Sequence, residues 1–261
     1  MALAAIAIGG CGKEEEAPKA LPLLITVKET SAHRFSYSAP RSIPAGLVRM
    51  TLENKGKKPH KAQLFRVLDG HSVRDALRAR RLPKWLISAG GVRVTAPGAR
   101  ASATQRLAPG TYYIAGSGRE RGWPAPLRVI GEEGDGGLPR TNASIVTREY
   151  NFTPSGLKAG TNSIEIRNEG LEPHHTVIAP VKPGTSVTKL RRFLSGRAKI
   201  PIGDVADVDA ATETAVLEEG QKQVLTLRLP RGEYALLCFV PDRGGGPAHV
   251  VKGMVDQVTV R

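Results

Sequence analysis

The sequence repeats itself at a spacing of 114 residues, and this repeat constrains the possible folds more than any other feature. Seven positions within 21 residues recur without a gap. They are Pro40, Ala45, Gly46, Asn54, Gly56, Pro59 and His60, matched by Pro154, Ala159, Gly160, Asn168, Gly170, Pro173 and His174. A later match of Gly110-Thr111-Tyr112 with Gly232-Glu233-Tyr234 has an offset of 122, so the second copy has gained eight residues. The chain therefore contains two copies of one folding unit.

The residue pattern inside the copies is that of β-strands. Residues 163–168 and 223–229 alternate apolar and polar side chains, which is typical of strands with one buried face. The 29 Gly and 19 Pro are spread along the chain and favour many short strands separated by turns. Apolar residues at helical spacing within 183–194 predict an inserted helix that packs one stripe on the strands.

These patterns predict an all-β fold of two tandem Greek-key β-sandwiches, each with a short inserted helix. The predicted division is a signal remnant and tether at 1–22, a first copy at 23–130, a linker at 131–142 and a second copy at 143–261. These two copies are called the first copy and the second copy below.

Soft metal ligands gather near the end of the second copy. Cys238, His249 and Met254 follow one another, and His174 lies upstream after Pro173. Two His, one Cys and a weak axial Met form the ligand set of a blue-copper site. His175 is the alternative metal ligand; because successive strand residues face opposite ways, one of the two neighbours is exposed or supports the site from behind.

The order of these motifs resembles the cupredoxin family, which includes the plastocyanin- and azurin-like domains. The resemblance rests on Asn168, Gly170 and Pro173-His174, then Gly232-Glu233-Tyr234 and Cys238, then His249 and Met254. It covers residues 145–261 well and residues 25–130 only as a fold. The resemblance implies one copper per chain, held by His174, Cys238, His249 and Met254, and outer-sphere electron transfer.

Two departures from the family pattern stand out. Ten residues separate Cys238 from His249, and the glycine-rich segment 243–247 in this gap predicts a looser, wetter site. The first copy keeps His60 but has Gly116 where Cys238 aligns, and no His or Met follows before Ile130. The first copy therefore lacks the thiolate and is interpreted as a metal-free module for docking or spacing.

The first eleven residues predict export. They form a short apolar run that ends Gly9-Gly10-Cys11 and resembles a bacterial lipobox, although a basic start is missing. In this interpretation Cys11 is lipidated, and the protein is anchored to the cell membrane facing the periplasm or the exterior; the alternative is a disordered tail. Cys238 is then the one cysteine of the folded part and has no partner for an internal disulfide.

The net charge of +14 is unevenly distributed. Residues 12–137 carry 22 Lys and Arg against 11 Asp and Glu, and the densest basic run is 74–84. Few aromatic residues lie among these charges, so nucleic-acid binding is not expected. An anionic lipid surface, a cell-wall polymer or an acidic redox partner protein fits better, and a plain solvated face is the alternative. The oligomeric state is left open.

Catalysis is not expected from the sequence. A multicopper oxidase needs His-x-His pairs, whereas this chain has six histidines and no such pair. The nucleophile-elbow, zinc-protease and phosphate-loop motifs are also absent from the sequence. Two other hypotheses remain: a metal-free binding or adhesion module, and a copper storage or delivery protein.

Overall fold

The computed structural model describes residues 19–261 except 32–33, 80, 117–121, 135 and 197–201. Cys11, the predicted lipidation site, and most of the predicted tether lie outside the described residues. The described part contains seventeen strands, two short α-helices and one 3-10 turn, so the predicted all-β fold is confirmed. None of its helices has the length and apolar character needed to cross a membrane.

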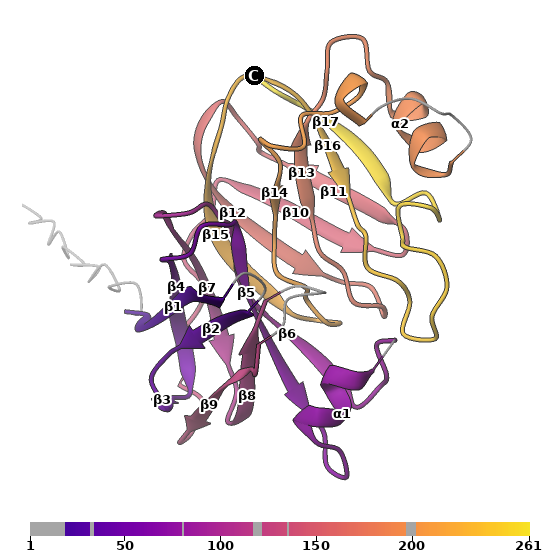
Figure 1. The fold of residues 1–261 in the computed structure, drawn as a ribbon. Helices are drawn as coiled ribbons and strands as arrows, with labels where there is room; N and C mark the ends of the chain where they lie inside the picture. The colour runs from indigo at the N-terminus through magenta and orange to yellow at the C-terminus, as the bar shows by residue number, and fades with distance from the viewer. Residues whose placement is uncertain (1–18, 32–33, 80, 117–121, 135, 197–201) are drawn as a thin grey trace, which may run out of the picture.

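An eight-stranded sheet runs through both copies (Figure 1). In spatial order its strands are β11 (Asn151–Ser155), β10 (Ala143–Arg148), β12 (Gly160–Asn168), β15 (Lys222–Leu229), β7 (Arg100–Leu107), β4 (Gly46–Asn54), β1 (Leu21–Ser31) and β2 (Arg34–Ser38). The junction is a short antiparallel pairing in which Val224 lies opposite Thr104 and Leu225 opposite Ala103. The two copies are therefore joined edge to edge.

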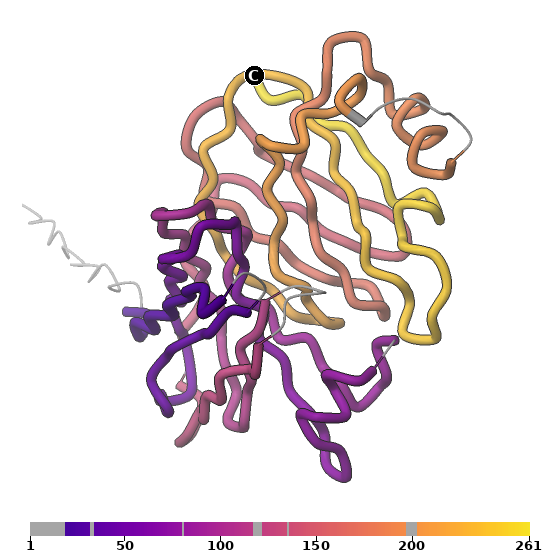
Figure 2. The backbone as a smooth tube through the Cα atoms, in the orientation of Figure 1, coloured from indigo at the N-terminus to yellow at the C-terminus, as the bar shows by residue number. Residues whose placement is uncertain are grey.

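Each half of this sheet faces a smaller sheet of its own copy. The first copy adds β3 (Ser42–Pro44), β9 (Ala125–Ile130), β8 (Gly110–Ala115), β5 (His60–Val67) and β6 (Leu86–Thr95). The second copy adds β14 (Thr212–Glu213), β13 (Val177–Pro180), β16 (Gly232–Leu237) and β17 (Val255–Val260). In Figure 2 the first copy is the indigo-to-magenta part of the tube, and the second copy is the pink-to-yellow part.

Each of the two copies has its own apolar core. In the first copy Ile25 of β1 packs in one buried cluster with Leu64 of β5. In the second copy Ile164 of β12 packs with Leu236 of β16, and Cys238 belongs to this cluster. Burial of an Ile or Leu side chain stabilises a fold by about 1.5–3 kcal/mol, so each core is a major source of stability.

The repeated sequence builds the same turn twice. The buried Asn54 donates through Nδ2 to Lys58 O at 2.8 Å and accepts from Gly56 N–H at 2.9 Å. The buried Asn168 donates to Glu172 O at 2.8 Å and accepts from Gly170 N–H at 2.9 Å. The hydroxyls of Tyr112 and Tyr234 likewise each donate to the carbonyl four residues earlier, at 2.9 Å. Much of the repeated sequence is thus explained by turn and corner hydrogen bonds.

The two inserted helices differ in what they cover. The α1 helix (Val73–Arg78) begins with a capping box between Ser72 and Asp75 and lies at the outer end of the first copy. The α2 helix (Val187–Leu194) buries Leu190 in a third cluster with Val250 and Val255, as its apolar stripe predicts. The 3-10 turn η1 (Ile202–Asp204) follows it.

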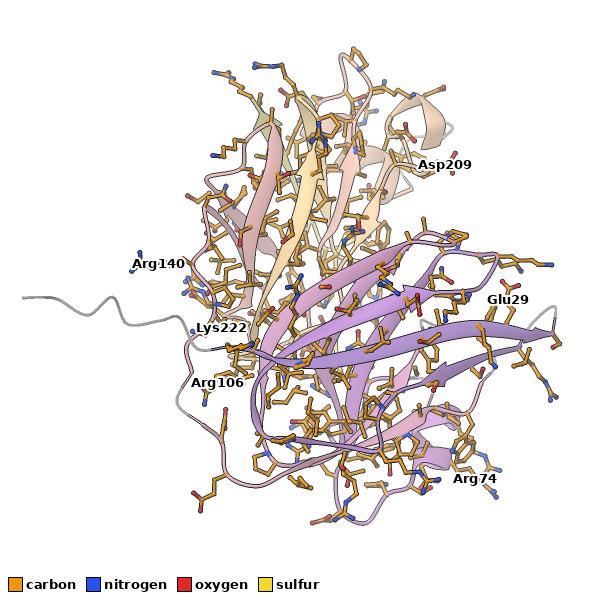
Figure 3. The ribbon with its side chains drawn as sticks, turned by 90° about the vertical axis from the view of Figure 1, so that its left-hand side faces the viewer. Glu29, Arg74, Arg106, Arg140, Asp209 and Lys222 are labelled. Atoms are coloured by element: carbon orange, nitrogen blue, oxygen red, sulfur yellow. The ribbon has the colours of Figure 1, made fainter. Side chains whose placement is uncertain are left out.

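The surplus of basic residues is spread over several faces. In Figure 3, Arg106, Arg140 and Lys222 lie on one side of the molecule, while Arg74 lies at the opposite lower corner. Arg106 forms an ion pair with Glu133 at 2.8 Å, so part of the charge is neutralised locally. The labelled basic residues therefore lie on more than one side of the molecule.

Candidate metal centre

Three predicted ligands meet inside the second copy. Cys238 Sγ lies 3.8 Å from His174 Nδ1 and 3.5 Å from His249 Nδ1, and the two Nδ1 atoms are 3.0 Å apart. All three side chains are buried. Donor atoms that share one ion at bond lengths of about 2.0 Å for nitrogen and about 2.3 Å for sulfur lie no more than about 4 Å apart. The observed separations satisfy this limit.

Backbone hydrogen bonds position each of the three residues. His174 follows the Asn168 turn and exchanges two backbone hydrogen bonds with Leu217, at 2.8 and 3.0 Å. His174 lies before strand β13, which starts at Val177, and the strand contact of His174 is a single bridge to Leu217. Cys238 follows the last residue of β16, and its carbonyl accepts from Val250 N–H at 2.8 Å.

The β16–β17 loop (residues 238–254) closes tightly around His249. His249 N–H donates to Val240 O at 2.9 Å, and Met254 N–H donates to His249 O at 2.9 Å. Met254 is fully buried and packs in the same apolar cluster as Cys238. Its role as an axial ligand stays a prediction.

Two carboxylates orient the imidazole rings. His174 Nε2 lies 3.3 Å from Glu149 Oε1, and His249 Nε2 lies 3.0 Å from Asp242 Oδ1. Burial acts to raise the pKa of Glu149, but the hydrogen bond from Glu172 N–H lowers it, and the net pKa lies below its ordinary value. Burial is likewise outweighed at Asp242, whose pKa is lowered by its hydrogen bond from Lys252. Both carboxylates are therefore ionised at neutral pH.

An ionised carboxylate can only accept a hydrogen bond, so each ring carries its proton on Nε2 and presents a lone pair at Nδ1. The two lone pairs then face each other at 3.0 Å, with the Cys238 sulfur beside them. Two acceptors at this distance repel each other, and a cation between them removes the repulsion. Carboxylates that hold the outer nitrogen of a ligand His are the usual support of a metal site.

Burial sets the protonation state of all three donors. It lowers the pKa of His174 to about 4, helped by His249 and opposed by Glu149. Burial also lowers the pKa of His249, against the effect of Asp242. Burial raises the pKa of the Cys238 thiol to about 12, although backbone N–H groups of His175 and Val240 act in the other direction. The imidazoles are thus neutral at pH 7, and the thiol needs a cation in order to ionise.

His175 does not join the three converging side chains. It is buried, its Nδ1 lies 3.1 Å from Glu213 Oε1, and its Nε2 accepts from Phe239 N–H at 2.9 Å. Burial lowers its pKa, with Glu213 acting in the opposite direction. Both ring nitrogens are therefore engaged in supporting the chain next to Cys238.

The corresponding place in the first copy has a different character. The ring of His60 packs edge-on against Phe35 with centroids 4.3 Å apart, and its Nε2 lies 4.0 Å from Glu29 Oε1. The aligned Gly116 offers no side-chain donor. His60 thus keeps the same turn and the same kind of carboxylate neighbour as His174 without a thiolate.

The supporting carboxylates and Arg243 were missed from the sequence. Asp242 follows Cys238 by four residues, and an acidic residue close to a predicted loop ligand is a usable signal. Glu149 had no such signal, because it precedes its histidine by 25 residues. The looseness of the site expected from segment 243–247 stays a prediction, although Arg243 at the start of this segment is held. Its N–H donates to Glu172 Oε2 at 2.8 Å, and its side chain contacts Pro83 and Glu218.

Comparison with known proteins finds similarity to solved structures alone. No family model matches the chain, and no curated protein sequence matches it. Reduced auracyanin from the photosynthetic bacterium Roseiflexus castenholzii is similar to it at 23% identity, over 45% of this chain and 94% of that chain, with a TM-score of 0.28. Copper nitrite reductase from Nitrosomonas europaea is similar at 14% identity, over 93% and 94% of the two chains, with a TM-score of 0.26.

A multi-copper oxidase from Pseudomonas thermotolerans is similar at 15% identity, over 95% of this chain and 69% of that chain, with a TM-score of 0.27. At such identities and TM-scores these structures carry no argument about this chain, whose candidate site rests on the three buried donors.

Proposed function

We propose that this chain is a cupredoxin-like electron-transfer protein that binds one copper ion in its second copy. The observation that carries the proposal is the convergence of His174, Cys238 and His249, with two inward lone pairs and one sulfur within 3.8 Å of one another. Two nitrogens and a soft sulfur favour copper over hard cations such as magnesium or calcium.

The residues fit this metal. His174 and His249 would bind through Nδ1, Cys238 through its thiolate and Met254 through a weak axial contact. Copper in such a donor set supplies a one-electron couple. Glu149 and Asp242 hold the two rings in place, so the donors need little rearrangement between oxidation states. Complete burial of the two rings and the thiol excludes water from the ligand atoms.

Electron transfer without catalysis fits the donor inventory best. The Greek-key arrangement of the two copies, the linker at 131–142 and a spacing role for the first copy belong to the same proposal. So do export and anchoring through a lipid on Cys11. An enzyme of the oxidase type would need more histidines than the six that this chain contains.

An acidic redox protein is the partner that fits the surface beside the site. The exposed Arg74, Arg78 and Lys84 belong to the run that ends next to the β16–β17 loop, where Arg81 Nη1 donates to Gly244 O at 3.2 Å. The positive charge would attract an acidic partner to the metal end of the second copy. This attraction should weaken as salt is added.

Visible absorption tests the proposal. Purified protein titrated with Cu(II) should develop an intense thiolate-to-copper band and keep one copper per chain through dialysis, whereas Cys238→Ser should lose the band. His60→Ala is the matched control, since it removes the equivalent histidine of the first copy and should leave the copper stoichiometry unchanged. A colourless wild-type protein that retains no copper would instead favour a metal-free binding module. Retention of several ions without the band would favour storage or delivery.

A further inference from the structure

Arg243 of the β16–β17 loop leaves its own copy and enters the first. Its Nη1 donates to Pro83 O at 2.9 Å and to Leu86 O at 3.0 Å. Its Nη2 forms an ion pair with Glu218, and the Arg243 side chain is only 14% exposed. A guanidinium offers several donors in a rigid fork, so one side chain here bonds two carbonyls and a carboxylate at once. This contact fixes the middle of the long loop.

Glu218 completes the contact from the other side. Its Oε1 accepts from Ser88 N–H of β6 at 2.8 Å. The glycines at 244–246 would otherwise leave this part of the loop with large conformational freedom. The yellow loop in Figure 2 accordingly reaches the purple segment of the first copy.

A second connection reaches the chain next to Cys238. Lys61 of β5, only 5% exposed, forms an ion pair with Glu213 of the second copy. Glu213 in turn contacts Nδ1 of His175, and Nε2 of the same ring accepts from Phe239 N–H. Lys61 aligns with His175 of the second copy. The two copies therefore have different residues at this equivalent position, and both residues contact Glu213.

A third connection passes through the backbone to His174. Gly90 N–H of β6 donates to Val216 O at 3.0 Å, and Ala89 forms a bridge with Leu217. Leu217 then exchanges two hydrogen bonds with His174. Contacts with the first copy thus reach the segment that carries each of the three donors. These contacts come from β5, from β6 and from segment 83–86.

We propose that the first copy serves as the fixed template of the metal site, and that Arg243 is the positioning residue that transmits this fixation to His249. The inference deepens the proposed function, because the site it positions is the proposed copper site. The first copy has Gly116 in place of a thiolate, but its surface contacts the segments of the second copy that carry the donors. A histidine held on a tethered loop stays near the other two donors before any metal arrives, which reduces the entropy lost on binding.

The test compares Arg243→Met with Arg100→Met. Arg100 forms an exposed ion pair with Glu53 at 2.6 Å and is the matched control, because it also belongs to an Arg–Glu pair but lies away from the loop. Amide hydrogen exchange of the metal-free proteins should accelerate at least tenfold across the β16–β17 loop in R243M and not in R100M. Affinity for Co²⁺, a metal without competing thiol oxidation, should fall about 10–100-fold in R243M, the range found for supporting residues of metal sites.

Two further variants separate positioning from general stability. Glu218→Gln keeps the shape of the contact and removes its ion pair, so it should weaken Co²⁺ binding even if R243M fails to fold. Arg243→Lys cannot reach two carbonyls and a carboxylate together and should give an intermediate affinity and an altered Co²⁺ spectrum. Loop exchange and Co²⁺ affinity equal to the wild type in R243M or, should that variant not fold, in E218Q would overturn the inference. Because exchange is measured without metal, a wild-type protein that binds no copper would refute the proposed function while still testing the template.

Discussion

Metal binding by this site should release one proton per ion, and the affinity should rise with pH. The perturbation is a change of pH from 7 to 9. The Cys238 thiol, with its pKa raised to about 12, is about five units from ionisation at pH 7. Ionising it costs about 7 kcal/mol, at 1.36 kcal/mol per unit. The bound cation must supply this energy, so the apparent Kd should fall about tenfold per pH unit, or about 100-fold over this range.

The imidazoles should add nothing to this proton release above pH 7. The pKa of His174 is lowered to about 4 and that of His249 is also lowered, so both rings are already neutral. The predicted slope of log Kd against pH is therefore close to one, whereas an exposed His₂Cys site would release more protons near pH 6.

Titration calorimetry with Zn²⁺, a redox-inert ion, measures both quantities. Runs at one pH in buffers of different ionisation enthalpy give the number of protons released, and runs at pH 7, 8 and 9 give the slope. Cys238→Ser is the control and should release no proton over this range. A pH-independent affinity for the wild-type protein, or a release unchanged in the serine variant, would contradict the assignment of the thiolate as a ligand.

Three further predictions follow from other parts of the structure. Asp242→Asn should weaken Zn²⁺ binding about 10–100-fold, because it removes the ionised acceptor that orients His249, and a competition titration measures this. The metal-free protein should lose about 2 kcal/mol between pH 7 and pH 5 from His174 alone. Stability falls as the pH is lowered because His174 takes up a proton near pH 6.5 in the unfolded chain, whereas the buried ring, with its pKa of about 4, stays neutral. Urea unfolding at both pH values measures the loss. Ile164→Ala should cost about 2–5 kcal/mol in the same assay, whereas exposed Leu171→Ala should cost no more than about 0.5 kcal/mol; equal costs would show that the second core is misplaced.

The strands of the second copy could be predicted because their local pattern is strong. The segment 163–168 lies within β12, and 223–229 lies within β15. Local alternation and turn chemistry carry this information within a few residues. The convergence of His174, Cys238 and His249 was expected from the resemblance to the cupredoxin family, because no local pattern links residues so far apart in the chain.

The joining of the two copies could not be predicted in the same way. The pairing of β15 with β7 involves two residue pairs, and nothing in the composition of Val224 or Ala103 marks them as partners. The fixation of the long loop escaped prediction for a related reason. Glycines around Arg243 indicate freedom when only the loop is considered, whereas its carbonyl and carboxylate partners lie in segments 83–86 and 218. Long-range contacts of this kind leave no local pattern.

X-ray absorption at the copper edge tests the central claim most directly, because it identifies the atoms bound to the ion. Copper-loaded protein should show two imidazole nitrogens and one short sulfur bond, and the sulfur contribution should disappear in Cys238→Ser. A first coordination sphere of nitrogen and oxygen alone, unchanged by that substitution, would show that the ion lies elsewhere and that the three buried donors are not its ligands.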